Sequence, residues 1–327
     1  MKKIKIKFVD FWPNFNYKNH FLYGELSKRY EIEISDHPDY IFFSVFGNEN
    51  LNYRNCVRIF YTAENISPDF NICDYAIGFD YINFDDRYLR LPNYYNYNYE
   101  KNFELIENRK KIDKLDRKEF CCFVYSNSKA DKFREELYEL ISSYKTVKSG
   151  GKFKNNVGGP VKNKLEFQKQ FKFCIACENA SYPGYTTEKI LDAFASGCIP
   201  IYWGDPLVEN VFNKKAFINC LNYKNTDDLL KFIKKVDNDD SLYLEMINQP
   251  IFNNEHDFQK MKLIELDNFL FHIFDQKLND SYRYNRTFYR DIYFTKMYDS
   301  NRLYNRSLKS ILKKCVQSMR LMRKKDN

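Results

Sequence analysis

FKFCIACENASYPGYTTEKILDAFASGCIPIYWG, residues 171–204, is the stretch that decides the fold. Its first seven residues, Phe171–Cys177, form an almost entirely apolar run, which is typical of a strand buried in a parallel sheet. Residues 187–196 then carry apolar side chains at helical spacing, Gly197 suits the left-handed position at a helix end, and 198–203 is a second apolar strand. Strand, helix and strand in this order predict an α/β unit with a parallel sheet.

The segments on both sides of this stretch repeat the alternation. Residues 1–95 contain a helical candidate at 19–29 and five strand-like segments, at 4–9, 30–34, 40–43, 57–61 and 75–78. A second series begins with an apolar strand at 120–125, continues with a helix near 130–144 and a glycine-bearing loop at 149–151, and ends with helices up to about residue 275. Such alternation is typical of parallel sheets that are covered by helices.

The charged segment 98–118 lacks apolar periodicity and divides the two series. We interpret it as a connection between domains, because domain boundaries fall in polar and weakly packed segments. The prediction is therefore an α/β protein of two Rossmann-like domains, residues 1–112 and 113–280, followed by a tail of residues 281–327.

The composition is that of a soluble globular chain. Of the 327 residues, 44% are hydrophobic, 18% aromatic and 29% charged, and the mean hydropathy of −0.64 argues against an integral membrane protein. The N-terminus alternates Ile4, Ile6 and Phe8 with charged residues, which indicates a first strand rather than the apolar core of a signal peptide. We therefore expect the chain to begin and stay in the cytoplasm.

Cysteine and histidine form no recognisable disulfide or metal pattern. The nine cysteines are an odd number without the regular spacing of a disulfide framework. Cys174 and Cys177 form a CxxC, but they lie inside an apolar strand and no second ligand pair completes a zinc site, so structural thiols are favoured. None of the four histidines lies near another at ligand spacing.

The net charge of +8 is concentrated in the C-terminal tail. Residues 282–327 hold thirteen Lys or Arg against three Asp, which leaves a balance near −2 for the rest of the chain. Opposite the basic residues, apolar ones recur at helical spacing: Leu308, Ile311, Leu312, Cys315, Val316, Met319 and Met322. A basic amphipathic helix favours attachment to an anionic membrane surface. Packing on the body or oligomerisation is the main alternative, and nucleic acid is disfavoured because no nucleic-acid module accompanies the tail.

The loop before the helix at 187–196 collects polar side chains. Glu178, Asn179 and Tyr185 follow the carboxyl end of a strand, where open α/β sheets bind their ligands. Polar residues in this position predict a ligand-binding loop.

The first turn of that helix has the properties of an anion site. Thr186 or Thr187 can cap the helix, and the free backbone N–H groups, the helix dipole and the charge of Lys189 together suit a diphosphate. The carboxylate of Glu188 can accept hydrogen bonds from sugar hydroxyls. The alternative is an ordinary capped helix with a surface Glu-Lys pair.

The same block, with KFCIACEN, YTTEKILDAF and IPIYWG in this order, resembles the α-1,3/4-fucosyltransferases of glycosyltransferase family 10, especially their bacterial members. Further matches are FYTAENISP at 60–68, DYAIGFD at 74–80, RYLRLP at 87–92 and a Ser126-Asn127…Arg134 pattern. The resemblance covers roughly residues 5–275. Ala63 stands where some relatives carry Gly, and the acceptor region 11–15 matches more weakly.

The resemblance implies a GT-B fold, in which two Rossmann-like domains face a central cleft. The first domain then binds the acceptor and the second binds GDP-fucose. By the same resemblance Glu64 is the catalytic base, and the donor is held by Arg134, Asn179, Tyr185, Glu188 and Lys189. Physically, Glu64 follows the apolar strand 57–61, where partial burial favours proton uptake. Cationic side chains can stabilise the departing diphosphate.

Other glycosyltransferases hold Mn²⁺ on an Asp-x-Asp pair to shield the diphosphate. The candidates here are Asp85-Asp86, in a turn between strands, and residues 237–240, which we interpret as a helix end with a solvated acidic turn. Neither follows an apolar strand as such a site would. We therefore expect no catalytic metal and no essential divalent cation.

These expectations combine into one function. The chain is expected to be an inverting α-1,3-fucosyltransferase that moves L-fucose from GDP-fucose to the GlcNAc or Glc of a β-galactoside oligosaccharide acceptor, such as a lipopolysaccharide glycan. Its tail is expected to hold it on the inner face of the cytoplasmic membrane. The alternatives are a GT-B transferase that uses another nucleotide sugar, or a non-catalytic protein that binds carbohydrate or a membrane surface.

Overall fold

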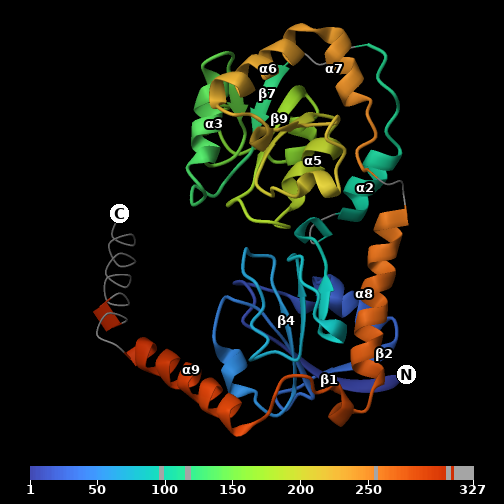
Figure 1. Ribbon diagram of the computed structural model, residues 1–327, viewed down its shortest axis with the longest axis vertical. Helices are drawn as coiled ribbons and strands as arrows, with labels where there is room; N and C mark the ends of the chain where they lie inside the picture. The colour runs from blue at the N-terminus through green and yellow to red at the C-terminus, as the bar shows by residue number, and fades with distance from the viewer. Residues whose placement is uncertain (96–98, 115–118, 254–256, 307–310, 313–327) are drawn as a thin grey trace.

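A computed structural model of the chain describes residues 1–95, 99–114, 119–253, 257–306 and 311–312. Two α/β units, one built on each of two parallel sheets, are stacked along the long axis of the molecule (Figure 1). The prediction of two Rossmann-like domains with parallel sheets is confirmed.

The first sheet has six parallel strands in the order β2-β1-β3-β4-β5-β6. Its strands are β1 (Lys2–Val9), β2 (Tyr30–Ile34), β3 (Tyr40–Phe43), β4 (Val57–Tyr61), β5 (Tyr75–Gly78) and β6 (Tyr88–Arg90). Every residue of β3, β4 and β5 is buried, as expected for central parallel strands with both faces covered. The shorter elements of this domain are α1 (Phe21–Ser27), η1 (Tyr17–Asn19), η2 (Glu49–Asn52), η3 (Asp85–Arg87) and η4 (Asn93–Tyr95).

The second sheet has five parallel strands in the order β11-β10-β9-β7-β8. Its strands are β7 (Glu119–Phe123), β8 (Val147–Ser149), β9 (Phe171–Cys177), β10 (Ile199–Trp203) and β11 (Ile218–Asn219). Its helical elements are α3 (Phe133–Ser142), α4 (Lys164–Gln168), α5 (Glu188–Ala195), η5 (Val208–Asn210), η6 (Cys220–Asn222), α6 (Thr226–Asn238) and α7 (Asp240–Ile247). The strand β9 lies in the middle of the sheet and is buried throughout, which explains its apolar sequence.

The predicted connection between the domains contains a helix, α2 (Tyr99–Glu107). This helix packs against α5 of the second domain, and Nδ2 of Asn102 donates to Oδ1 of Asp192 at 2.7 Å. Aromatic rings continue the contact, because Tyr94 and Phe103 lie within 6.5 Å of one another and Tyr94 lies 5.8 Å from Phe212. The connection is therefore a packed joint between the two domains.

A long helix, α8 (Asp257–Asp275), returns from the second domain to the first (Figure 1). The ring of Phe274 lies 4.5 Å from Tyr40 and 5.7 Å from Tyr30, and Tyr30 also donates from its hydroxyl to Asp275. The end of the predicted second domain thus packs on the first sheet. The domain boundaries at 112 and 280 stay predictions, and this crossing is a feature that the sequence did not reveal.

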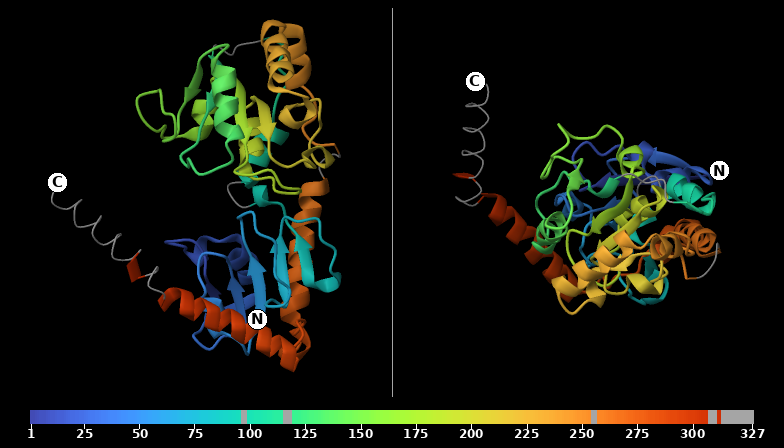
Figure 2. Two further views of the ribbon diagram at one scale, coloured as in Figure 1. Left: turned by 60° about the vertical axis from the view of Figure 1, so that its left-hand side comes forward. Right: turned by 90° about the horizontal axis from the view of Figure 1, so that it is seen from above.

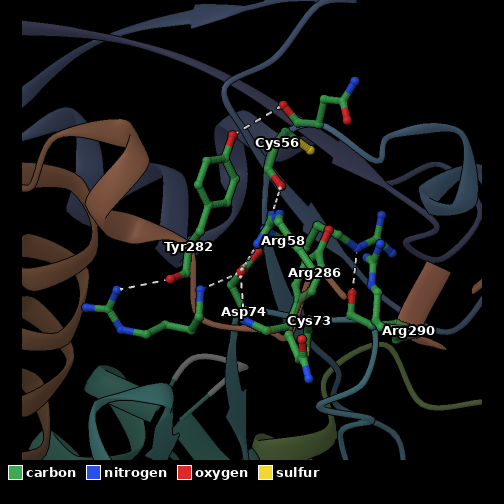
Figure 3. A network of polar contacts seen from close by, with 12 residues as sticks. Cys56, Arg58, Cys73, Asp74, Tyr282, Arg286 and Arg290 are labelled. Carbon is green, nitrogen blue, oxygen red and sulfur yellow. Dashed lines mark hydrogen bonds and ion pairs between the residues drawn. The ribbon is translucent and has the colours of Figure 1, made fainter. Parts of the chain in front are cut away.

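The chain then continues as η7 (Leu278–Ser281) and α9 (Phe288–Arg306). The segment between them is fixed to the first domain by Asp74, which is completely buried (Figure 3). Oδ1 of Asp74 accepts from the backbone N–H groups of Arg283 at 2.7 Å and Tyr284 at 3.1 Å, and from Nη1 of Arg286 at 3.1 Å. Oδ2 accepts from the backbone of Arg58.

Beyond this anchor, α9 extends outward from the end of the first domain that lies away from the second (Figures 1 and 2). Of the predicted tail 281–327, residues 307–310 and 313–327 lie outside the described residues, and with them most of the apolar positions of the expected amphipathic helix. Within the part that is described, no helix is both long and apolar enough to span a bilayer.

Candidate active site

Glu64 lies three residues beyond the carboxyl end of β4, in a turn that buried side chains hold in place. Its backbone N–H donates to Oγ1 of Thr62 at 3.1 Å, and Nδ2 of Asn93 donates to the carbonyl of Ala63 at 2.8 Å. The side chain of Glu64 itself is exposed, so the expected partial burial is wrong. The turn that carries the carboxylate is fixed, while the carboxylate remains accessible.

Glu178, the residue after β9, is the centre of a buried polar cluster in the second domain. Oε1 accepts from the backbone N–H of Thr187 at 2.8 Å, and Oε2 accepts from the hydroxyl of Thr187 at 2.6 Å and from Nζ of Lys189 at 3.0 Å. Gly204 leaves the space for this side chain, since a Cβ there would lie 2.4 Å from Cγ of Glu178. Burial raises the pKa of Glu178, and the nearby Lys189 opposes that shift.

Lys189 and Glu188 occupy the first turn of α5, as predicted, and both interact with this cluster. Nζ of Lys189 lies 3.6 Å from Oε1 of Glu188, and only 13% of the Lys189 side chain is exposed. Burial would lower the pKa of Lys189, but Glu178 and Glu188 outweigh it and the pKa is raised. Burial would likewise raise the pKa of Glu188, but Lys189 and Lys164 hold it below its usual range. A surface Glu-Lys pair does not describe this arrangement.

Thr187 is the N-cap residue of α5, but its hydroxyl does not cap the helix. It donates to Glu178 and accepts from Nζ of Lys189 at 2.8 Å. The predicted capping position is therefore correct and the predicted capping bond is wrong, because a buried carboxylate competes for the hydroxyl proton.

Arg134 is the second residue of α3 and is 2% exposed. Nη1 donates to Oδ1 of Asn179 at 3.1 Å, Nη2 donates to the carbonyl of Asn127, and the guanidinium carbon lies 4.6 Å from the ring centre of Tyr125. The two cations contact neighbouring residues of one loop, because Arg134 donates to Asn179 and Lys189 donates to Glu178. Among the described residues no carboxylate forms an ion pair with Arg134. Burying a guanidinium without a counter-ion costs folding free energy. A bound anion beside Arg134 would remove much of this cost.

The two halves of the site meet at the loop that carries Tyr185. The ring of Tyr185 lies 5.3 Å from Phe79, which directly follows β5 of the first sheet. Burial raises the pKa of Tyr185, and the charges of Glu178 and Glu64 raise it further. Tyr185 thus contacts the first domain from the loop of the second domain that leads to the Glu178 cluster.

Gly184 makes this close approach possible. Its φ of +84° is left-handed, and a Cβ at this position would lie 2.6 Å from the carbonyl oxygen of Phe79. Any other residue would therefore strain the backbone and separate the two domains at this point.

An open cavity of about 350 Å³ borders Glu188 on the side that faces α2. Its polar lining is Lys101, Asn102, Lys162, Asn163, Lys164, Glu188 and Asp192. Three lysines and two carboxylates surround this space, so both anionic groups and sugar hydroxyls would find partners there.

Two of the acidic groups weighed as metal ligands, Asp237 and Asp86, have cationic partners. Asp237 belongs to α6, and its side chain is 3% exposed. It pairs with Lys145, and its Oδ1 lies 2.8 Å from Nζ of Lys172. The expected solvated turn is therefore wrong for Asp237, because the helix extends to Asn238 and buries it. Asp86 pairs with Arg283 at 2.7 Å. In the described part of the chain, no cluster of three or more His, Cys, Asp or Glu could hold a metal ion.

Two kinds of site residue were not predicted from the sequence. Glu178 was placed in the ligand loop without a role, although a Glu directly after an apolar strand and close to a Lys is a signal for a buried pair. Asn93 and Asp80, which hold the Glu64 turn, have no local pattern that would identify them, since their partners lie far along the chain. Cys174 and Cys177 are buried free thiols, as expected.

Comparison with known proteins identifies two family models along the chain. Residues 6–97 match the N-terminal domain of alpha-(1,3)-fucosyltransferase FucT, and residues 114–266 match the C-terminal region of the glycosyltransferase family 10 fucosyltransferases. The chain is 38% identical to the alpha-(1,3)-fucosyltransferase FucT of Helicobacter pylori over 76% of its own length. It spans 60% of the length of that relative.

Solved structures give the same result. The chain is similar to a crystal structure of an alpha1,3-fucosyltransferase, with a TM-score of 0.71 and 33% identity over 82% of this chain and 90% of that one. A structure of an alpha1,3-fucosyltransferase with GDP-fucose matches with a TM-score of 0.69 and 33% identity over 83% and 91% of the two chains. The matched region therefore includes both domains.

Proposed function

The chain belongs to the fucosyltransferases of glycosyltransferase family 10, and from this premise we propose that it is an inverting α-1,3-fucosyltransferase. It transfers L-fucose from GDP-fucose to the GlcNAc or Glc of a β-galactoside acceptor. The observation that carries this proposal is the contact of Tyr185 with Phe79 at 5.3 Å, which holds the loop of the second domain that leads to Lys189 against the end of β5 in the first sheet. Glu64 follows the neighbouring strand β4 at the same edge of that sheet.

In the donor site, Arg134 and Lys189 bind the diphosphate of GDP-fucose. Arg134 is buried, is held by Asn179 and has a charge that no described carboxylate neutralises, so the diphosphate supplies the missing anion. Glu188 borders the cavity beside α5 and accepts hydrogen bonds from sugar hydroxyls of the nucleotide sugar. Tyr185 closes the site on the side of the first domain.

The chemical step uses Glu64 as the general base. Glu64 takes the proton of the acceptor hydroxyl while that oxygen attacks C1 of fucose. The bond between C1 and the phosphate oxygen breaks on the opposite face, GDP leaves with the bonding electrons, and the configuration at C1 is inverted. The departing diphosphate gains negative charge, which Arg134 and Lys189 stabilise, each by about 2.7–4 kcal/mol.

The variant Glu64→Gln tests the role of the base. Its affinity for GDP-fucose, measured by calorimetry, should equal that of the unmodified protein. The rate of GDP release with N-acetyllactosamine should fall about 1,000-fold or more, because general base catalysis accelerates a reaction by roughly 100- to 10,000-fold. Glu49→Gln, another exposed acid after a strand of the same sheet, is the matched control and should retain turnover. Substantial turnover in Glu64→Gln would exclude Glu64 as the base.

A nucleotide panel separates this proposal from a transferase that uses another sugar donor. Only GDP and GDP-linked sugars should raise the melting temperature, because a ligand that binds the folded state alone stabilises it. An equal rise of the melting temperature with UDP would favour a transferase that uses a UDP-linked sugar. A non-catalytic protein that binds carbohydrate would release no GDP in the presence of any β-galactoside.

Two further parts of the proposal have their own tests. We propose that no divalent cation is required, so transfer in excess EDTA should proceed at the unmodified rate, and a loss that Mn²⁺ restores would contradict this. Analysis of the product linkage separates α-1,3 from α-1,4 transfer.

We also propose that the basic C-terminal tail holds the enzyme on the cytoplasmic face of the membrane. Arg283, Arg286 and Arg290 pack on the first domain, but residues 291–327 still hold ten Lys or Arg against three Asp, which supports this. In a flotation experiment at low salt, the full chain should rise with vesicles that contain about 30% phosphatidylglycerol, because basic side chains are attracted to anionic lipid. It should not rise with neutral vesicles. Equal recovery with neutral vesicles would contradict an electrostatic attachment.

A further inference from the structure

The loop between β9 and α5, residues 178–187 (the donor loop), rests on Phe79 of the first domain. The ring of Phe79 lies 5.3 Å from that of Tyr185 and 5.9 Å from that of Tyr182. Phe79 is completely buried, and Nε of Arg90 donates to its backbone carbonyl at 3.1 Å. The position of Phe79 therefore depends on the donor loop as well as on the first sheet.

Asp80, the next residue, holds the turn of residues 63–67 that carries Glu64 (the base turn). Asp80 is 4% exposed, and its Oδ1 accepts from the hydroxyl of Ser67 at 2.8 Å. Ser67 lies three residues after Glu64, at one end of the turn, and Asn93 donates to the backbone at the other end. The base turn is therefore held from both ends, and Asp80 holds it from a position adjacent to the donor-loop contact.

Folding stability alone does not explain a carboxylate at position 80. Oδ2 of Asp80 is buried and has no hydrogen-bond partner among the described residues. A buried charged oxygen without a partner costs folding free energy, whereas an amide of the same shape carries no charge. A carboxylate can only accept, and it accepts a stronger hydrogen bond than a neutral amide does, so it holds the hydroxyl of Ser67 in one orientation. Groups that lower stability in this way are typical of functional sites.

We propose, on the basis of the fucosyltransferase function above, that Asp80 is a positioning residue that links the donor loop to the base turn. Binding of GDP-fucose fixes the donor loop on Phe79, the adjacent Asp80 holds Ser67, and the carboxylate of Glu64 is thereby set at the acceptor hydroxyl. Asp80 itself does not touch the reacting atoms. Its effect on the rate is nevertheless large, because a displacement of about 1 Å in a catalytic group can slow a reaction roughly 100-fold.

The variants Asp80→Asn and Ser67→Ala test this link by kinetics. Asp80→Asn removes the unpaired buried charge, so the melting temperature should stay the same or rise. Its kcat with N-acetyllactosamine should fall about 10- to 100-fold, because the base turn is held less firmly. Ser67→Ala, at an exposed position, should show a similar loss of kcat. In both variants the Kd for GDP-fucose should stay within about twofold of that of the unmodified protein.

Two matched variants separate the link from a general effect on this loop. Ser67→Thr retains the hydroxyl and should retain kcat. Asp69→Asn changes a carboxylate two residues farther along, which accepts from the backbone N–H of Asn71 at 2.9 Å, and it should leave kcat unchanged. Because Asp80 and Ser67 act through one hydrogen bond, the double variant should lose no more than either single variant. Additive losses, or an equal loss in Asp69→Asn, would overturn the proposal.

Hydrogen exchange tests the link without turnover. The backbone N–H groups of Glu64 and Ile66 form hydrogen bonds within or next to the base turn, so their exchange reports its order. Saturating GDP should slow this exchange about fivefold or more in the unmodified protein and in Ser67→Thr, which is the lower end of typical couplings between two sites. It should not do so in Asp80→Asn or Ser67→Ala. No slowing in the unmodified protein, or the same slowing in Ser67→Ala, would overturn the link.

The proposed function and the link would fail in different ways. If GDP slows the exchange of the base turn only where the bond between Ser67 and Asp80 is present, but no fucose is transferred to any β-galactoside, the proposed function fails and the link stands. If the unmodified protein transfers fucose and Asp80→Asn transfers it at the same rate, the function stands and the link is overturned.

Discussion

Nζ of Lys189 lies 3.0 Å from Oε2 of Glu178, a carboxylate that is completely buried. Lys189 therefore stabilises the fold as well as the proposed donor site. In Lys189→Met, the affinity for GDP should fall about 30- to 100-fold, since a charge-assisted hydrogen bond contributes roughly 2–3 kcal/mol. The melting temperature should also fall, because the unpaired Glu178 costs roughly 3 kcal/mol. Calorimetry with GDP and thermal unfolding measure the two effects.

A second substitution separates these two roles. Adding Glu178→Gln to Lys189→Met removes the unpaired buried charge and should restore much of the melting temperature. The affinity for GDP should stay low, because the cation that meets the diphosphate is still missing. Recovery of both quantities together would mean that Lys189 acts on GDP only through the fold.

Arg134 should be sensitive to its geometry as well as to its charge. The guanidinium contacts Asn179, Asn127 and the ring of Tyr125 at the same time, which a lysine ammonium cannot do. Arg134→Lys should therefore weaken GDP binding at least tenfold, about 1.4 kcal/mol, as measured by calorimetry. Arg58→Lys is the matched control, since Arg58 is equally buried and distant from the donor site. It should lower stability and leave GDP affinity unchanged, and a similar loss of affinity in both variants would contradict a specific role for Arg134.

Most of the longer strands of both sheets could be predicted from the sequence. In the first sheet, the segments at 30–34, 40–43, 57–61 and 75–78 coincide with β2, β3, β4 and β5, and in the second sheet 171–177 coincides with β9. Short runs rich in β-branched and aromatic residues between polar turns leave little freedom in the bounds of a strand. The short edge strand β11 has two residues and β6 has three, which is too few for a periodic pattern. The helix α2 was missed because its charged sequence hides one apolar face that packs on α5.

The candidate site could be predicted only where its residues are adjacent in sequence. The turn with Glu188 and Lys189 follows from a strand and a cap, whereas the resemblance alone gave Glu64 and Arg134 their roles. Contacts between distant segments carry no local signal, as the contact of Tyr185 with Phe79 illustrates. The predicted partial burial of Glu64 was also wrong. How far its side chain is buried depends on all the loops at this edge of the sheet and not only on the preceding strand.

Asp74 should be among the most important residues for stability. It is completely buried and accepts four hydrogen bonds, three of them from the C-terminal segment that begins at Arg283 (Figure 3). In Asp74→Asn, the new amide NH2 would face the backbone N–H of Arg58 or that of Tyr284. Two donors then face each other without an acceptor, and the ion pair with Arg286 is lost. The free energy of unfolding should fall by roughly 3 kcal/mol.

Hydrogen exchange locates the effect of Asp74→Asn. Amides of α9 and of the segment before it should lose protection first, because Asp74 holds this segment on the first domain. Asp291→Asn is the control, since Asp291 is 63% exposed and its ion pair with Arg290 contributes little. Unchanged protection of the C-terminal segment in Asp74→Asn would mean that other contacts, such as the stacking of Arg290 on Tyr284, are sufficient.

His20 should give the protein a dependence of stability on pH below neutrality. Burial among aromatic rings lowers the pKa of His20 to about 4, whereas in the unfolded chain it titrates near 6.5. Between these values the unfolded chain binds a proton that the folded one does not, so the stability present above pH 6.5 decreases as the pH falls toward 4. From pH 7.5 to 5.0 the loss should be about 2 kcal/mol, measured by urea unfolding. His20→Phe should remove this decrease in the free energy of unfolding. His37→Gln, at an exposed position, should not remove it. A pH dependence that is the same in His20→Phe and in the unmodified protein would mean that His20 has the same pKa in the folded and the unfolded chain, so that burial does not lower it.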